Sequence, residues 1–425
     1  MVTEKAGGMS TLAEPAQWPP PEQATGRFLP FSAPWVGAEE IEELLEVLGS
    51  GWLTAGPRTG RFEQAFREYV GTAHAVATSS CTAALHLALR ALDIGEGDAV
   101  LTSPFTFAAT ANVIVHCGAE VLFADICPST HNLDPAAVER FLVERCAPAP
   151  EGGLRTRQSG RRLRAAIAVH YGGQSCDMAK LGALASRFQF VLIEDAAHAA
   201  GGRYRGRPVG TLGRAACFSF YPTKNMTTGE GGMLATDDRA LAERARRLAQ
   251  HGISRDGWQR YSSDGDWLYD VEEAGYKYNM TDLQAALGLH QLRRLDGFIE
   301  RRRKLAARYD QGLEGRSDLI LPVETAGIYH ARHLYPVQVV SPRIDRGRLI
   351  EKLRERRIGT SVHFLPLHLT GFYQRRFGFR RGDFPVAEQV FERIVSLPLF
   401  PAMTEEQVDQ VVEAAREILD GRAGS

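Results

Sequence analysis

The chain has 425 residues, of which 44% are hydrophobic and 24% are charged, and its formal net charge at pH 7 is -1. This composition is typical of a globular protein with a large core and about two domains, and the near-zero charge argues against a general nucleic-acid binder. The six cysteines form no CxxC pair, so we expect neither a disulfide framework nor a metal site. No apolar run approaches the roughly 18 residues of a membrane span, and no leader pattern opens the chain. We therefore expect a cytoplasmic protein that does not bind membranes.

The first 26 residues are rich in Pro, Ala, Gly and Glu, which predicts a mobile arm without a core of its own. From about residue 73, short apolar runs alternate with amphipathic patterns of helical period. This alternation predicts an open, largely parallel α/β sheet. The expected strands lie near 73–80, 99–102, 120–125, 165–171, 190–194, 216–220 and 232–236. The expected helices lie near 38–48, 63–69, 82–92, 135–144, 178–188 and 239–250.

A long apolar stripe of helical period covers 282–313, and the pattern changes after Gly315. The expected elements are then a strand and three helices, near 333–340, 345–357, 384–395 and 405–419. This change predicts a smaller α+β domain packed on the first, with the boundary inside 296–316. The expected division is an N-terminal arm over 1–26, a large α/β domain over 27–300 and a small C-terminal domain over 301–425.

A basic run covers 155–164 between an expected helix and an expected strand. A diphosphate could bind such a run, but no partner motif accompanies it. We expect a solvated loop here.

A polar run, Thr-Ser-Ser-Cys-Thr over 78–82, joins the first strand of the expected sheet to a helix. Hydroxyls and free N–H groups at a helix N-terminus can hold an anion. Ser and Thr are also ordinary capping residues, so capping explains the run equally well. The run contains no GxGxxG, which argues against a classical dinucleotide site.

Two carboxylates, Glu194 and Asp195, end a very apolar strand, and His198 follows three residues later. A carboxylate at this position is either a helix cap or a charge with a buried cationic partner. Ligands of open parallel sheets bind beyond the carboxyl ends of the strands, where these residues are expected. A histidine here is more often a packed or capping residue than a functional one.

Lys224 follows a later strand and Pro222, and a run of Thr and Gly follows it. Pyridoxal phosphate (PLP) requires three groups: a binding site for its phosphate, a carboxylate and a lysine. Candidates for all three lie at successive strand ends of the expected sheet. The carboxylate keeps the ring nitrogen protonated, and the lysine holds the aldehyde as a Schiff base. A partly desolvated site lowers the pKa of the lysine and makes part of it a free amine.

Nine segments in order give the chain a resemblance to a known family over about residues 28–420. They are GWLTAGPRTGRFE (51–63), SSCTAALHLAL, SPFTFAATANVI (103–114), VHYGGQSCDM, IEDAAHAAGG, FSFYPTKNMTTGEGGML, HGISRD (251–256), YKYNMTDLQAALGLHQL and HFLPLH (363–368). The chain resembles the DegT/DnrJ/EryC1/StrS aminotransferases of nucleotide-sugar and aminocyclitol biosynthesis. This resemblance implies fold type I, with a large α/β domain, a small C-terminal domain and a homodimer whose active sites lie at the subunit interface.

The resemblance also implies roles for individual residues. Lys224 would hold PLP covalently, with Asp195 facing the pyridinium nitrogen and His198 near the ring hydroxyl. Residues expected to contact the ring or its phosphate are Phe107 by stacking, Cys81 through its backbone, Thr82, Ser219 and, from the partner subunit, Asn279. Residues expected to border the sugar pocket are Arg255, in the HGISRD segment, and His363.

The implied reaction moves the amino group of L-glutamate, through pyridoxamine phosphate, to a keto group of a nucleotide-linked sugar. The stretch between Arg255 and Tyr276 is similar to the branch that acts on UDP-linked 4-keto sugars, so a UDP- or dTDP-linked 4-keto sugar, for example a 4-keto-6-deoxy sugar, is expected. An aminotransferase of keto-inositols would share every motif and remains an alternative. A regulator without catalysis is a second alternative, whereas a dehydratase of this fold would carry histidine at position 224.

Overall fold

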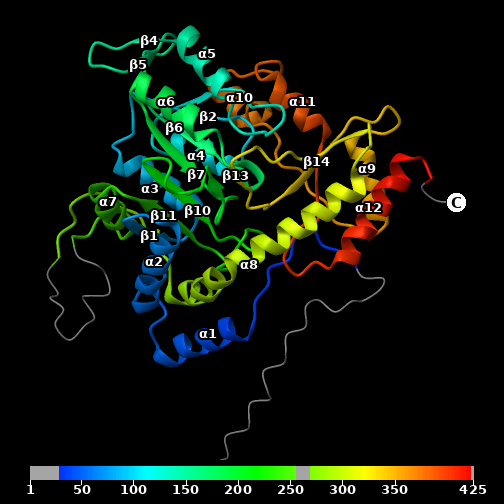
Figure 1. Ribbon diagram of the computed structural model, residues 1–425. Helices are drawn as coiled ribbons and strands as arrows, with labels where there is room; N and C mark the ends of the chain where they lie inside the picture. The colour runs from blue at the N-terminus through cyan, green and yellow to red at the C-terminus, as the bar shows by residue number, and fades with distance from the viewer. Residues whose placement is uncertain (1–27, 255–268, 423–425) are drawn as a thin grey trace, which may run out of the picture.

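The computed structural model describes residues 28–254 and 269–422, so the predicted arm over 1–26 and Arg255 lie outside the described residues. Figure 1 shows a layered α/β body joined by one long helix to a smaller group of elements. None of the helices in the described ranges combines the length and hydrophobicity of a membrane-spanning helix.

The centre of the larger body is a sheet with the strand order β1-β11-β10-β7-β6-β2-β3. These strands are β1 (His74–Thr78), β2 (Asp98–Thr102), β3 (Glu120–Phe123), β6 (Arg162–Val169), β7 (Val191–Asp195), β10 (Ala215–Ser219) and β11 (Gly232–Thr236). The strand β11 is antiparallel to both of its neighbours, and the pairs from β10 to β3 are parallel. The predicted α/β class is therefore confirmed, and its seven expected strands correspond to these.

Helices cover both faces of this sheet because its strands are apolar on both sides. Alternate residues of β10 show the two cores: Ala215 and Cys217 pack with α3, α4 and α7, and Ala216 and Phe218 pack with α2 and α8. The helices are α2 (Pro57–Val70), α3 (Cys81–Ala91), α4 (Ala108–His116), α5 (Pro135–Arg145), α6 (Met178–Phe188), α7 (Arg239–Ala249) and α8 (Asp282–Leu313). The helix α1 (Ala38–Ser50) lies against α8 at the edge of this body (Figure 1).

The smaller group of elements is built on a three-stranded antiparallel sheet with the order β12-β14-β15. Its elements are β12 (Leu319–Ile320), β14 (Tyr335–Val339), α9 (Arg346–Glu355), α10 (Gly371–Phe377), α11 (Pro385–Arg393), β15 (Ile394–Leu397) and α12 (Glu405–Leu419). A third, small sheet joins β8 (Arg203–Tyr204) to β9 (Arg207–Pro208) and β13 (Ile328–Tyr329).

The helix α8 connects the two groups (Figure 1). Its Leu295 and Ile299 pack in the core with α2, and its Leu305 and Tyr309 pack in the core with α12. We propose that the boundary between the large and small domains lies inside this helix, near residue 300.

Two expectations at the level of elements are wrong. The basic run 155–164 is not a loop: its first residues belong to β5 (Leu154–Thr156), which forms a hairpin with β4 (Cys146–Pro148), and its last residues begin β6. The short polar strands of this hairpin lack the apolar run that marks a buried strand. The helix expected over 384–395 ends at Arg393, because Ile394 begins the extended strand β15 in the core.

Candidate active site

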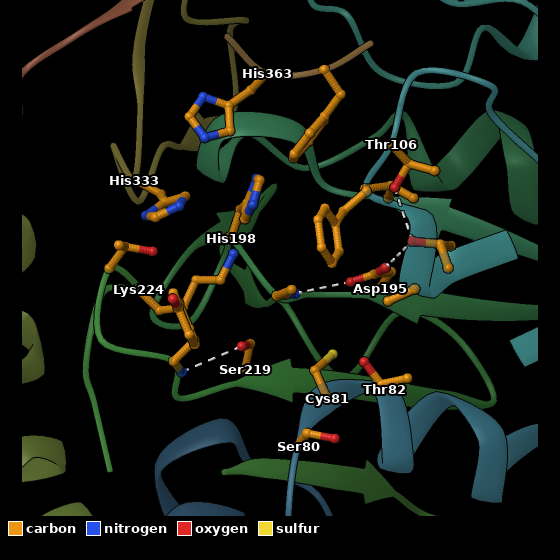
Figure 2. Close-up of a pocket in the computed structure, with 18 of the residues that line it drawn as sticks. Ser80, Cys81, Thr82, Thr106, Asp195, His198, Ser219, Lys224, His333 and His363 are labelled. Carbon is orange, nitrogen blue, oxygen red and sulfur yellow. Dashed lines mark hydrogen bonds between the residues drawn. The ribbon is translucent and has the colours of Figure 1, made fainter. Parts of the chain in front are cut away.

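A cavity of about 580 Å³ opens where the carboxyl ends of β7 and β10 meet the first turn of α3. Figure 2 shows its walls: the turn with Ser80, Cys81 and Thr82 lies on one side, and a group of histidines lies on the other. Lys224 and Asp195 lie between these two walls. This position agrees with the general rule that open α/β sheets bind ligands beyond the carboxyl ends of their strands.

The first turn of α3 offers a site for an anion. Ser80 caps the helix by accepting a hydrogen bond from the Ala83 N–H at 3.1 Å. The first intrahelical bond comes from Ala84, so the N–H groups of Cys81 and Thr82 precede it. The Cys81 thiol points away from this turn and donates to the Cys217 carbonyl at 3.4 Å, leaving the backbone of Cys81 for a ligand. The positive end of the helix dipole adds to this site.

The strand β11 supports this turn by direct backbone contact. A Cβ atom added at Gly232 would lie 2.4 Å from the Ser80 carbonyl carbon and 2.5 Å from the Cys81 nitrogen. Real Cβ atoms do not approach non-bonded atoms this closely, so only glycine allows β11 to lie at this distance from the turn. On the neighbouring strand, Ser219 ends β10 and lines the same end of the cavity.

Asp195 is only 4% exposed and accepts two hydrogen bonds. Its Oδ2 accepts from the Thr110 hydroxyl at 2.7 Å, and its Oδ1 accepts from the Ala197 N–H at 3.2 Å. Burial raises the pKa of Asp195, whereas the Thr110 hydroxyl and the Lys224 charge lower it. A buried carboxylate on a cavity wall is well placed for a cationic ligand.

The neighbouring Glu194 points to the other side of the strand. Its carboxylate accepts from the N–H groups of Gly210, Leu212 and Gly213 and from the His170 ring, at 2.8 to 3.0 Å. These bonds hold the loop before β10 against the sheet. Of the two acidic residues at this strand end, only Asp195 therefore faces the cavity.

Lys224 lies in the turn after β10, where its N–H donates to the Tyr221 carbonyl at 2.9 Å. Its side chain lines the cavity. Burial lowers the pKa of Lys224 to about 8, although nearby Cys81 and Asp195 act in the opposite direction. A lysine with this pKa is a free amine in a useful fraction of molecules near neutral pH, as a nucleophile or a base must be.

Three histidines, His198, His333 and His363, form the wall opposite α3 (Figure 2). The His198 Nδ1 accepts from the Gly172 N–H at 3.2 Å, so the neutral ring carries its proton on Nε2. Burial and the Lys224 charge lower the pKa of His198 well below its usual value and that of His363 to about 4. The wall is therefore uncharged at neutral pH and offers hydrogen bonds.

His333 was not among the residues expected from the sequence. Its ring lies 4.4 Å from that of His198, centroid to centroid. The loop that carries it is held by backbone bonds from Ala331 to the Gly173 carbonyl and from Leu334 to the Gly172 carbonyl. In the sequence, His333 stands at the start of an expected strand and not at its carboxyl end, so the rule that located the other site residues does not mark it.

Phe107 lines the cavity and is 64% exposed, an unusual state for a large apolar side chain. An exposed aromatic ring on a cavity wall suits stacking on a flat ligand. Asn279 does not line this cavity; its backbone pairs with Thr78, and its Nδ2 donates to the Met280 carbonyl at 3.1 Å. Its role across a subunit interface remains a prediction.

The cavity thus brings together most of the residues expected from the sequence, and it fits PLP. The first turn of α3 and Ser219 suit a phosphate, the buried Asp195 suits a pyridinium nitrogen, and the partly deprotonated Lys224 suits an aldehyde. Among the described residues, no group of three or more His, Cys, Asp or Glu is arranged to hold a metal ion.

Replacing Gly232 with Ala should weaken PLP binding. The added Cβ would push β11 away from the backbone at Ser80 and Cys81, which we expect to receive the phosphate. We expect at least about a tenfold rise in the PLP dissociation constant and a loss of roughly 1–3 kcal/mol in stability. Titration of the apoprotein with PLP and thermal melting measure the two effects. Gly182→Ala is the control, since a Cβ there meets nothing within 4 Å, and equal affinity in both variants would contradict the prediction.

Comparison with known proteins finds similar proteins over most of the chain. The model of the DegT/DnrJ/EryC1/StrS aminotransferase family matches residues 34–416. The spore coat polysaccharide biosynthesis protein SpsC of Bacillus subtilis is 48% identical over 402 residues, which cover 94% of this chain and 99% of SpsC. The putative sugar aminotransferase Spr1654 of Streptococcus pneumoniae in its PMP form has a TM-score of 0.82 at 31% identity, covering 92% of this chain and 99% of its own. PseC of Helicobacter pylori, an aminotransferase of pseudoaminic acid biosynthesis, has a TM-score of 0.82 at 26% identity, covering 93% of this chain and 100% of its own.

Proposed function

Because this chain belongs to the DegT/DnrJ/EryC1/StrS aminotransferase family and is a PLP-dependent sugar aminotransferase, we propose that it moves the amino group of L-glutamate to a nucleotide-linked keto sugar. The observation that carries this proposal is the cavity in which Lys224, Asp195 and the α3 turn converge. The keto group would be at carbon 4 of a UDP- or dTDP-linked sugar, such as a 4-keto-6-deoxy sugar. We further propose a cytoplasmic homodimer.

Bound PLP supplies an electron sink that makes the Cα–H of an amino acid acidic enough for a side chain to remove. In this proposal, Lys224 would hold the cofactor until the donor binds, and its freed Nζ would then take the proton from the donor Cα. In the second half of the reaction, the same Nζ would deliver a proton to the sugar carbon that receives the amino group. Such positioned proton transfer contributes roughly 10²–10⁴-fold to a rate. Asp195 keeps its negative charge in the cavity, and Ser219, Thr82 and the Cys81 backbone bind the phosphate.

The chemistry of the cavity wall supports a sugar as the acceptor. Neutral imidazoles of His198, His333 and His363 can form hydrogen bonds to hydroxyl and keto groups. His198, whose Nδ1 already accepts from Gly172, has its Nε2–H left to donate. Lys224 is the only Lys or Arg among the described residues that line the cavity. The carboxylates of glutamate and a diphosphate need further cations. We propose that Arg255 and residues of a partner subunit supply them.

A substrate panel tests this function. The purified enzyme is incubated with L-glutamate and UDP- or dTDP-linked 4-keto sugars, with keto-inositols in parallel, and 2-oxoglutarate is measured. We expect continued release of 2-oxoglutarate, beyond the single half-reaction that glutamate alone supports, with a nucleotide-linked sugar and not with the free sugar or the inositols. Turnover of a keto-inositol alone would favour the aminocyclitol alternative. A folded protein that binds no PLP and turns over no substrate would favour a regulator. Replacing glutamate with glutamine or aspartate, with the aminated sugar measured as the product, tests the donor.

A further inference from the structure

Two threonine hydroxyls form a chain that ends on the carboxylate of Asp195. The Thr110 hydroxyl donates to the Asp195 Oδ2 at 2.7 Å, and the Thr106 and Thr110 hydroxyls lie 2.8 Å apart. A threonine has one hydroxyl hydrogen, and that of Thr110 is donated to Asp195. The Thr106 hydroxyl must therefore donate to Thr110. Hydrogen bonding thus runs in one direction along the chain, toward the carboxylate.

The threonine chain is buried and belongs to the cavity. Thr106 is 2% exposed and Thr110 is 1% exposed, and both line the same cavity as Asp195. Thr110 lies in the first turn of α4, and Thr106 lies one residue before Phe107, the N-cap of that helix. The positive end of the α4 dipole lies behind the hydroxyls and also favours a negative charge on Asp195. The Thr110 hydroxyl reaches the carboxylate from α4, whereas the Ala197 N–H reaches it from the turn that follows β7.

The direction of donation selects one charge state of Asp195. A pyridinium ring is held by an ionised carboxylate, because a protonated carboxyl carries no charge to pair with the ring. Burial favours the protonated form, and hydrogen bonds donated to the carboxylate favour the ionised form. In agreement, burial raises the pKa of Asp195, and the bond from Thr110 lowers it.

We propose that Thr110, supported by Thr106, is a positioning residue that holds the Asp195 carboxylate ionised and oriented for the pyridinium nitrogen of PLP. The proposal rests on the PLP dependence of the family and not on the identity of the sugar or the donor. Thr110 acts on the cofactor only through Asp195. Its loss should therefore affect those properties that depend on the ring nitrogen.

The test is PLP binding to the apoprotein of Thr110→Val, which keeps the β-branched shape and removes the hydroxyl. We expect the PLP dissociation constant to rise about tenfold near neutral pH, as for the loss of a hydrogen bond to a charged group. The rise should increase as the pH falls, because more of the carboxyl is then protonated. Thr110→Ser retains the hydroxyl and should restore binding to near the wild-type value. Thr106→Val should change binding in the same direction as Thr110→Val and by a smaller factor.

A second ligand separates positioning from packing. The benzene-ring analogue of PLP has the same aldehyde, hydroxyl and phosphate but no ring nitrogen. Wild type and Thr110→Val should bind this analogue equally, whereas a packing defect would weaken both ligands alike. Equal PLP affinity in wild type and Thr110→Val from pH 6 to 9, or a Thr110→Ser variant as weak as Thr110→Val, would overturn the proposal. Binding is measured without any sugar, so failure of the proposed acceptor would leave this result unchanged.

Discussion

Lys224→Ala should abolish amino transfer and remove the visible absorption band of bound PLP. The variant would lose both the amine that we propose holds the cofactor and the base that we propose moves the proton, and no other Lys or Arg lines the cavity among the described residues. Since general base catalysis alone contributes roughly 10²–10⁴-fold, we expect turnover to fall at least about 10³-fold. Absorption spectra of the purified protein and release of 2-oxoglutarate from glutamate measure the two losses.

Lys180→Ala is the matched control for this variant. Lys180 is an exposed residue of α6 that pairs with Asp177 at 3.2 Å, and it does not line the cavity. The control should keep the absorption band and the turnover of the wild type. If Lys224→Ala also kept both, Lys224 would not be the residue that holds the cofactor.

Asp195→Asn should have the next largest effect, because it removes the charge that we propose pairs with the ring nitrogen and keeps the shape of the side chain. Removing one partner of a buried ion pair costs about 3–5 kcal/mol, which corresponds to roughly 10²–10⁴-fold in kcat/KM. Steady-state kinetics with glutamate and titration of the apoprotein with PLP measure this loss.

Glu194→Gln provides the contrast for Asp195→Asn. The adjacent Glu194 faces away from the cavity and accepts bonds from three backbone N–H groups of the loop before β10. We therefore expect Glu194→Gln to lower the melting temperature, with PLP affinity retained in the folded protein. A similar loss of PLP affinity in the two variants would show that the charge of Asp195 has no specific role.

Much of the site could be predicted because its residues follow strongly apolar strands. Asp195, Ser219 and Lys224 each lie at or just beyond the end of such a strand, and parallel strands bring their carboxyl ends to one edge of the sheet. The run at Cys81 and Thr82 could be found for the same reason, since it joins a strand to a helix. These positions depend on local pattern and sheet topology, which a sequence carries directly.

Residues placed by tertiary contacts could not be predicted in this way. His333 enters the cavity on a loop that is held by backbone bonds to Gly172 and Gly173, far away in the sequence. Thr110 has the pattern of an ordinary residue of a helix, and only its distance to Asp195 reveals its contact. The helix α4 itself was not expected, since its Val and Ile residues are β-branched and favour strands.

The position of β11 also determines when the site can form during synthesis of the chain. Among the described strands, β1 pairs in the sheet only with β11, which joins His74 to Thr236, a residue far away in the sequence. Thr78 pairs further along with Asn279. The turn with Ser80, Cys81 and Thr82 therefore lacks the backbone contact with Gly232 until the ribosome has delivered β11. Pairings between strands so distant in the sequence form slowly. We therefore expect cofactor binding to follow the delivery of β11, because nascent chains that end before β11 leave the edges of both β1 and β10 without this partner strand.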